Sequence, residues 1–326
     1  MRIGVTGATG FIGRALVRRL LAQGSDVQVL ARPSPGAAQI EAIGARVVTG
    51  DLRDKPAIAR LVMGTDVVYH LAAMVDSPGT KAAFIEANLN GTENVLEACL
   101  AGGVRRVVYA SSIAVYGLAK PGEPIDENTS FDDQPERRDL YAQSKILADQ
   151  FAMSFSRKTG LPLTVIRPGI VFGAGKQLPI GLLGFHAGKT NFVFGARANR
   201  FPVIYVENLT DALQLAAQPD RAEPQQFNIV DDDDLTLASY HQSKSQLDGT
   251  TAIFLPGWPV RFVASIVGAA SRVLPIAGGA LSAHQVERAL QDRSYLTRRI
   301  RAELGWKPRI SLSDALRRSL DPEPAK

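Results

Sequence analysis

Two tyrosine–lysine pairs in this sequence have a spacing that suits proton transfer. Tyr141 and Lys145 lie in "YAQSK", and Tyr240 and Lys244 lie in "YHQSK". Residues i and i+4 of a helix share one face, so each lysine could lie beside its tyrosine and stabilise the phenolate. A free tyrosine, with a pKa of about 10, is too weak a base near neutral pH. A tyrosine beside an ammonium group could exchange a proton with an alcohol or a ketone, so the two pairs compete for one chemical role.

The residues that precede each pair distinguish them. The first pair follows an apolar strand that ends in Ser111 and Ser112, whose hydroxyl groups could bond to a substrate oxygen. The second pair follows the acidic run 231–234, whose negative charge would raise the pKa of Tyr240 and oppose catalysis. We predict that the first pair is catalytic, and we interpret the second as an exposed helix pair near an acidic loop.

A glycine-rich turn predicts a dinucleotide site near the N-terminus. Gly7, Gly10 and Gly13 recur every three residues between an apolar strand and an amphipathic helix. Glycine at the first positions lets backbone N–H groups approach a pyrophosphate, and Gly13 allows close helix packing. This context is the one in which the motif is informative.

The end of the second predicted strand bears on the choice of cofactor. An NAD site usually has an acid there for the ribose 2′-hydroxyl, whereas this chain has Ala31 and Arg32. Arginine suits a 2′-phosphate, so NADP is favoured and NAD stays possible. In the alternative interpretation, Arg32 is only a charged residue at a strand exit.

The elements that must position these residues alternate along the first half of the chain. Short β-branched runs predict buried strands, and an amphipathic helix is predicted at 11–24 and another at 82–103. The predicted strands are 2–7, 26–32, 45–51, 66–73, 104–112 and 161–169. Such alternation predicts an α/β fold with a Rossmann-type, doubly wound parallel sheet.

The alternation loosens after Gly173. Short strands are predicted at 191–194, 201–206, 225–230 and 251–256. We predict an NAD(P)-binding Rossmann domain at 1–173. Residues 174–326 are predicted to form mainly a smaller substrate-binding lobe, with some segments returning to the Rossmann sheet.

Composition excludes several classes of function. The net charge of +5 arises near the C-terminus among interleaved acids and few aromatics, which predicts a solvated helical surface and no nucleic-acid partner. The one cysteine, Cys99, excludes an internal disulfide and is typical of a reducing compartment, so we expect a cytoplasmic protein. The four histidines show no metal-ligand spacing, so no metal is expected.

Membrane insertion and export are also not expected. The apolar stretch 258–280 is interrupted by Arg261, Arg272 and Pro275, which makes it a poor membrane span. A strand and turn begin directly at the first residues, which leaves no room for a signal peptide.

Five motifs taken in order resemble the extended short-chain dehydrogenase/reductase superfamily. They are "TGATGFIG", "GDLRD", "HLAA", "ASSIAVYG" and "YAQSK", and the ending "RAELGWKPRISLSDALRRSL" is also similar. The resemblance implies a catalytic triad of Ser112, Tyr141 and Lys145. In the family pattern the serine lies four residues before the tyrosine of "VYG", here Tyr116, which selects Ser112 over Ser111.

The resemblance also implies a set of cofactor contacts from the phosphate turn, the strand exits and the loop at the nicotinamide end. These residues are Gly7, Thr9, Gly10, Phe11, Ile12, Gly13, Arg32, Asp51, Leu52, Leu71, Ala72, Ala73, Asn88, Tyr141, Lys145, Pro168 and Val171. Asn88 could instead bond locally to backbone, and His70 is interpreted as a packing residue. The helices after the fourth and fifth strands pair across a dimer in many family members, so a homodimer is expected.

The resemblance also bears on the class of substrate. Many nucleotide-sugar enzymes of the superfamily have an asparagine where this chain has Ile170, and the segment 201–213 is closer to the 3β-hydroxysteroid dehydrogenase branch. We therefore expect a small-molecule substrate: a secondary alcohol or ketone on a cyclic, steroid-like or sugar-like compound. The alternative is a nucleotide-sugar epimerase or dehydratase with tightly held NAD(P), and a third class is a cofactor-binding regulator, against which the intact triad argues.

Overall fold

A parallel sheet forms the centre of the molecule. The computed structural model describes residues 1–75, 78–117, 123–178, 184–218, 224–231, 235–270 and 283–320. Its seven-stranded sheet has the order β11-β6-β5-β4-β1-β2-β3, and neighbouring strands run parallel. The strands are β1 (Arg2–Thr6), β2 (Asp26–Ala31), β3 (Arg46–Thr49), β4 (Val67–His70), β5 (Arg106–Ala110), β6 (Leu163–Pro168) and β11 (Gln225–Ile229). The predicted doubly wound α/β fold is confirmed.

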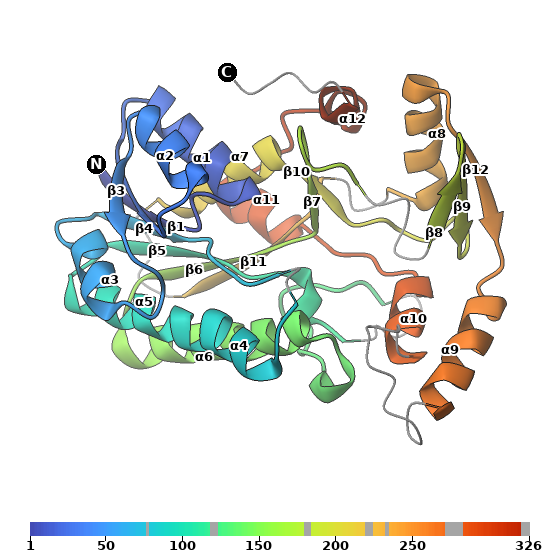
Figure 1. The fold of residues 1–326 in the computed structure, drawn as a ribbon, viewed down its shortest axis with the longest axis horizontal. Coiled ribbons are helices and arrows are strands. Elements are labelled where there is room, and N and C mark those ends of the chain that lie inside the picture. Colours follow the sequence, from blue (N-terminus) through green and yellow to red (C-terminus); the bar gives the residue numbers. More distant parts are fainter. Residues whose placement is uncertain are drawn as a thin grey trace.

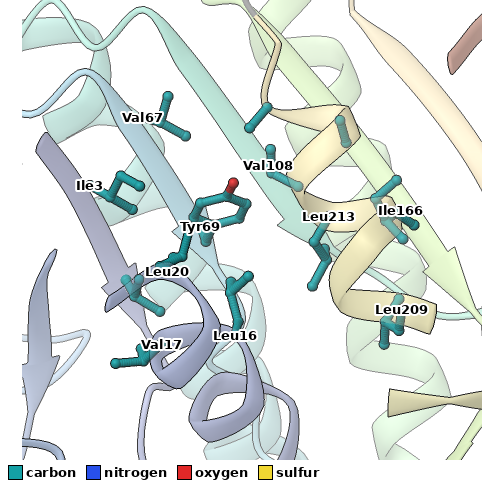
Figure 2. Packing of buried hydrophobic residues seen from close by; sticks show 14 of the residues in the cluster. Ile3, Leu16, Val17, Leu20, Val67, Tyr69, Val108, Ile166, Leu209 and Leu213 are labelled. Atoms are coloured by element: carbon teal, nitrogen blue, oxygen red, sulfur yellow. The ribbon is translucent and has the colours of Figure 1, made fainter. Parts of the chain in front are cut away.

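Helices cover both faces of this sheet (Figure 1). One face packs against α1 (Phe11–Ala22), α2 (Pro35–Ala42), α7 (Val206–Ala216) and α11 (Arg298–Leu304). The other packs against α3 (Lys55–Val62), α5 (Gly91–Ala101) and α6 (Leu140–Thr159). Figure 2 shows the first of these layers, where Leu16 and Leu20 of α1 and Leu213 of α7 lie against Tyr69 and Val108 of the sheet.

The predicted helix at 82–103 contains an irregular turn. The chain forms α4 (Lys81–Ile85), then a π-helical segment from Glu86 to Asn90, then α5. The wider turn places Asn88 where its side chain bonds to the backbone of Met74, and these bonds offset the cost of leaving regular helix geometry. Single π-turns of this kind occur frequently at functional sites.

The second half of the chain builds smaller layers beside the sheet (Figure 1). The strands β7 (Ile170–Phe172) and β10 (Val203–Tyr205) pair, and β8 (Gly184–Ala187), β9 (Thr190–Phe194) and β12 (Thr251–Leu255) form a three-stranded sheet. The helices there are α8 (Leu237–Asp248), α9 (Trp258–Ala270), α10 (Ala283–Leu290) and α12 (Leu312–Leu320). Single 3₁₀ turns lie at Ile113–Val115 and Pro135–Arg137. The four short strands predicted after Gly173 are confirmed, whereas the boundary between two domains stays a prediction.

Within the part of the chain that the structure describes, no helix is both long and apolar enough to span a bilayer.

Cys99 is fully buried in the core, and burial raises the pKa of its thiol.

Candidate active site

The glycine turn between β1 and α1 leaves no space for side chains. Gly7 has φ +75°, and a Cβ added there would lie 2.6 Å from the backbone nitrogen of Ala72. A Cβ on Gly13 would lie 2.1 Å from the carbonyl oxygen of Gly7. Gly10 is the N-cap of α1 and provides no side-chain cap, whereas Ser34 caps α2 through its side chain. The first N–H groups of α1 are therefore available to an anionic ligand.

A cavity of about 690 Å³ opens at one edge of the large sheet. It lies at the carboxyl ends of β1, β2, β3 and β4, which is where doubly wound folds bind dinucleotides. Among the residues predicted to contact the cofactor, the cavity is lined by Gly7, Thr9, Gly10, Arg32, Asp51, Leu52, Leu71, Ala72 and Ala73. Its size is in the usual range for ligand pockets.

The end of the cavity at the exits of β2 and β3 carries two arginines. Arg53 Nη2 donates to Asp51 Oδ2 at 2.6 Å, and the Arg53 backbone N–H donates to Asp51 Oδ1 at 2.9 Å. The Arg53 side-chain bonds lower the pKa of the Asp51 carboxyl, and the charge of Arg32 adds to this effect. Leu52 is held by Asn94, whose Nδ2 donates to the Leu52 carbonyl at 2.8 Å.

Asn88 fastens the cavity wall to helix α6. Its Oδ1 accepts from the Met74 N–H at 2.7 Å, and its Nδ2 donates to the Met74 carbonyl at 2.9 Å and to Ser144 Oγ at 2.8 Å. Met74 lines the cavity, and Ser144 lies between Tyr141 and Lys145 on α6. The amide is therefore used within the protein, and Asn88 does not line the cavity.

The two serines at the end of β5 have different surroundings. Ser111 Oγ donates to Asp149 Oδ2 at 2.6 Å, and Asp149 also accepts from Arg167 Nε and Nη2 at 2.9 Å each. This pair is fully buried, so Ser111 serves the interior. Ser112 is partly exposed and caps the 3₁₀ turn by accepting from the Ala114 N–H at 3.0 Å. The distinction favours Ser112 as the residue that could reach a substrate.

Lys145 occupies a buried position at the start of α6. Its Nζ donates to Tyr109 Oη at 2.8 Å and to the Ala110 carbonyl at 2.7 Å, and it lies 4.3 Å from the centre of the Tyr109 ring. Burial lowers the pKa of Lys145 to about 7, although Asp149 opposes the shift. Burial raises the pKa of the Tyr109 phenol, and the charges of Asp149 and Tyr141 add to this.

A chain of polar side chains continues from Lys145 towards the glycine turn. The Tyr109 ring stacks on that of His70 with the ring centres 5.4 Å apart, Thr92 Oγ1 lies 3.0 Å from His70 Nε2, and His70 Nδ1 lies 2.7 Å from Thr6 Oγ1. Burial lowers the pKa of His70 to about 3, and the charge of Lys145 adds to the effect. His70 is therefore a neutral interior link, as its interpretation as a packing residue requires.

The second tyrosine–lysine pair is not the exposed helix pair that we expected. Both residues lie on α8, but Tyr240 is buried against Phe201 and His241. Lys244 forms an ion pair with Asp248, one helical turn further along. Burial raises the pKa of Tyr240, and the charge of Asp248 adds to it, so this tyrosine is a core residue. Of the acidic run, Asp232, Asp233 and Asp234 lie outside the described residues.

The remaining predicted contacts are not among the residues that line the cavity; they are Phe11, Ile12, Gly13, Asn88, Tyr141, Lys145, Pro168 and Val171. Phe11 and Ile12 are in the first turn of α1, where Phe11 packs against the cluster that contains Phe172, and Ile12 packs against the core of the sheet. Pro168 ends β6, and Val171 lies in β7. The sequence analysis missed Tyr109, Asn94 and the Asp149–Arg167 pair, because each reads as an ordinary strand or helix residue until its partner is known.

Because the pKa of Lys145 is lowered, the free-energy cost of burying its side chain should depend on pH. Below pH 7 the folded protein carries a buried ammonium, whereas between pH 7 and 10.5 only the unfolded chain keeps that proton, so wild-type stability rises with pH. We expect Lys145→Met to have a higher free energy of unfolding than the wild type, and the difference should be largest at and below pH 7. Above pH 7 this relative gain should shrink by about 1.4 kcal/mol per pH unit.

Thermal unfolding of both proteins between pH 6 and 9 measures this difference. Lys244→Met, whose ion pair is partly exposed, is the matched control and should show no such trend. A difference between Lys145→Met and wild type that stays constant with pH would contradict the shift.

The sheet, the glycine turn and the cavity define a protein of the dinucleotide-binding, doubly wound class. A family model described as "NAD dependent epimerase/dehydratase family" matches residues 3–230. The chain therefore belongs to that family, and the predicted resemblance is confirmed.

Two curated relatives carry the names of a reductase and a dehydrogenase. The chain is 33% identical to a 2-alkyl-3-oxoalkanoate reductase of Stenotrophomonas maltophilia, over 66% of this chain and 65% of the relative. It is 29% identical to a 3 beta-hydroxysteroid dehydrogenase/Delta 5-->4-isomerase of Mycobacterium tuberculosis, over 97% of this chain and 88% of the relative. The match thus spans just under two thirds of the length of the first of these proteins.

A solved structure shares the fold. The UDP-glucose-4-epimerase of Stenotrophomonas maltophilia, with bound NAD and formylated UDP-arabinopyranose, superposes with a TM-score of 0.74 at 22% identity. The similarity covers 98% of this chain and 96% of that one. It supports the fold assignment alone.

Proposed function

We propose that the protein is an NADP-dependent oxidoreductase that moves a hydride between nicotinamide and a secondary alcohol or ketone on a cyclic, steroid-like or sugar-like substrate. The observation that carries this proposal is the link between cavity and helix: Met74, which lines the cavity, bonds to Asn88, which bonds to Ser144 between Tyr141 and Lys145. The reductase and dehydrogenase names among the relatives favour a net redox reaction.

The residues of this chain would divide the chemistry as follows. The bound cofactor supplies or accepts the hydride. Tyr141 gives a proton to the developing alkoxide during reduction and removes it during oxidation. In its protonated form Lys145 lowers the pKa of the Tyr141 phenol, and Ser112 donates a hydrogen bond to the reacting oxygen and holds it in place.

The site also fits the dinucleotide itself. The uncapped N-terminus of α1 and the close approach at Gly7 suit the pyrophosphate. The cavity residues Arg32 and Arg53 suit the 2′-phosphate of NADP, because guanidinium groups bind phosphate through paired hydrogen bonds. No acid stands at the end of β2 to select the ribose hydroxyl of NAD.

The test is a spectroscopic assay with steroid and sugar alcohols and both oxidised cofactors. We expect reduced nicotinamide to form in proportion to ketone, with NADP preferred at least tenfold over NAD. Arg32→Ala should reduce that preference about tenfold, the effect of losing one charge-assisted phosphate contact. Arg46→Ala, which lies on the neighbouring strand and pairs with Asp26, is the control. Tighter binding of NAD by the wild type would overturn the cofactor assignment.

The alternative is a nucleotide-sugar epimerase, which oxidises its substrate transiently and returns the hydride to the same molecule. The observation that favours this alternative is the nucleotide sugar bound in the structural relative. Conversion of a nucleotide sugar without net change in reduced nicotinamide would favour the epimerase over the oxidoreductase.

We further propose that the protein acts in the cytoplasm as a homodimer. The single thiol, Cys99, fits a reducing compartment. Leu100 at the end of α5 and Leu147 on α6 are each about 40% exposed, and such apolar positions suit a helix-paired interface. Sedimentation equilibrium would show the mass of one chain if the dimer assignment is wrong.

A further inference from the structure

Arg293 is a buried cation that the proposed chemistry does not use. It lies in the segment between α10 and α11 and is 7% exposed. Its Nε and Nη1 atoms are buried, and in the described structure neither has a hydrogen-bond partner. A guanidinium group withdrawn from water without a partner is costly, so such a group in a native fold calls for a specific reason.

Backbone hydrogen bonds hold the segment that carries Arg293. Ile125 N–H donates to the Ser294 carbonyl at 2.8 Å, and Leu296 N–H donates to the Ile125 carbonyl at 2.9 Å. The Arg293 guanidinium lies 6.0 Å from the centre of the Tyr295 ring. The Tyr295 hydroxyl is also buried and, in the part of the chain that is described, has no partner.

The nearest acid in the sequence is turned away from Arg293. Asp292 is exposed, and its carboxylate accepts from the Arg200 backbone N–H at 2.7 Å and from Arg200 Nη1 at 2.6 Å. The charge of Arg293 is therefore not neutralised by its neighbour. Two buried donors, a guanidinium and a phenol, are left together.

Tyr295 lies in a packed cluster that includes the chain neighbours of two proposed catalytic residues. Tyr295 packs in one cluster with Ile113, which follows Ser112, and with Ile146, which follows Lys145. Its ring is 6.2 Å from that of Tyr116, the tyrosine of "VYG". Tyr295 and Arg293 are thus separated from Ser112 and Lys145 by one layer of packed side chains.

We propose that Arg293 binds an anionic oxygen group of the substrate, a carboxylate or a phosphate, while Tyr295 donates a hydrogen bond beside it. Planar guanidinium groups favour carboxylate and phosphate oxygens over uncharged acceptors, and the buried setting strengthens the bond. The inference rests on the proposed function and makes it more specific, because a neutral sterol-like alcohol would leave Arg293 unsatisfied. The substrate class is then an acidic alcohol or ketone.

The experiment is a calorimetric titration of the NADP-saturated protein with three probes. The probes are a 2-alkyl-3-hydroxyalkanoate, its uncharged methyl ester, and UDP-glucose. We expect one of the two anions to bind at least about 30-fold more tightly than the ester, the size of one charge-assisted contact. The preferred anion distinguishes a carboxylate from a diphosphate.

Arg293→Met should abolish this preference and leave the affinity for the ester within about twofold. The matched control is Arg298→Met, which changes an exposed arginine at the start of α11 and should keep the preference. NADP binding, measured without substrate, reports that the Arg293→Met fold is intact, since Arg293 does not line the cofactor cavity.

A wild type without anion preference, or an Arg293→Met protein that keeps it or weakens all three probes equally, would overturn the assignment of Arg293. Failure of the proposed function looks different. In that case no ketone forms with NADP from any alcohol, while the anion preference and its loss in Arg293→Met persist.

Discussion

Replacing Tyr141 by phenylalanine should lower kcat about a thousandfold, within the range expected when a general acid–base group is removed. The substitution deletes one oxygen and keeps the ring, which is partly buried at the start of α6. Because Tyr141 is not among the residues lining the cofactor cavity, binding of NADP should change less than threefold. Steady-state kinetics with the best alcohol of the screen, together with fluorescence titration of NADPH, measure both quantities.

Tyr240→Phe is the matched control, because it removes the same atom from the same position of a Tyr-x-Gln-Ser-Lys motif. Tyr240 is enclosed by Phe201 and His241 in the core of the second half. Its loss should leave kcat within about twofold of wild type. If Tyr240→Phe were inactive and Tyr141→Phe active, the whole assignment of the active site would be wrong.

Gly13→Ala should abolish high-affinity cofactor binding. The added methyl carbon would lie 2.1 Å from the Gly7 carbonyl oxygen and 2.7 Å from the Ala8 Cα, and both are backbone atoms that cannot rotate away. Relief of the clash must push α1 away from the turn that forms the phosphate site. We expect affinity for NADP to fall at least 100-fold and stability to fall by several kcal/mol, as overpacking against backbone does.

Gly36→Ala provides the comparison within the same layer of helices. Its added carbon would lie 3.5 Å from the Thr9 side chain, an ordinary contact, and α2 should gain stability from the better helix former. Isothermal titration and thermal unfolding of both variants would separate the steric effect from a general effect of removing glycine. Tight NADP binding by Gly13→Ala would show that the turn does not form the phosphate site.

The sequence predicted the fold because its signals are local. Strands such as β1, β2 and β4 are short apolar runs rich in β-branched residues, and α1 follows its glycine turn directly. The π-helical segment at Glu86–Asn90 could not be predicted in this way. It depends on Asn88 meeting the backbone of Met74 from another element, and no periodicity records such a contact.

Some residues of the candidate site could also be predicted from local motifs, whereas others depend on contacts between distant segments. Residues in motifs, such as Gly10, Arg32 and Asp51, were named from the sequence and line the cavity. Lys145 was expected to lie beside Tyr141, which stays a prediction, whereas the structure shows its Nζ bonded to Tyr109 and the Ala110 carbonyl. Tyr109 carries no signal of this role, since a tyrosine in a buried strand is ordinary.

The burial of Tyr240 was missed for a related reason. The short motif and the acidic run suggested a solvated surface, but α8 is buried by residues outside the helix, such as Phe201 and Phe254. Local charge is a weak guide where tertiary packing decides.

The packing of α7, β11 and α11 on the large sheet constrains when that sheet can be finished on the ribosome. Leu213, Phe227, Ile300 and Trp306 belong to the same core cluster as Ile3 and Leu16. Synthesis proceeds from the N-terminus, so strands β1 to β6 emerge long before the residues that cover one of their faces. The apolar surface at β5 and β6 is consequently exposed in the nascent chain until residue 306 has left the exit tunnel. During this interval the nascent chain offers its largest apolar surface to a chaperone.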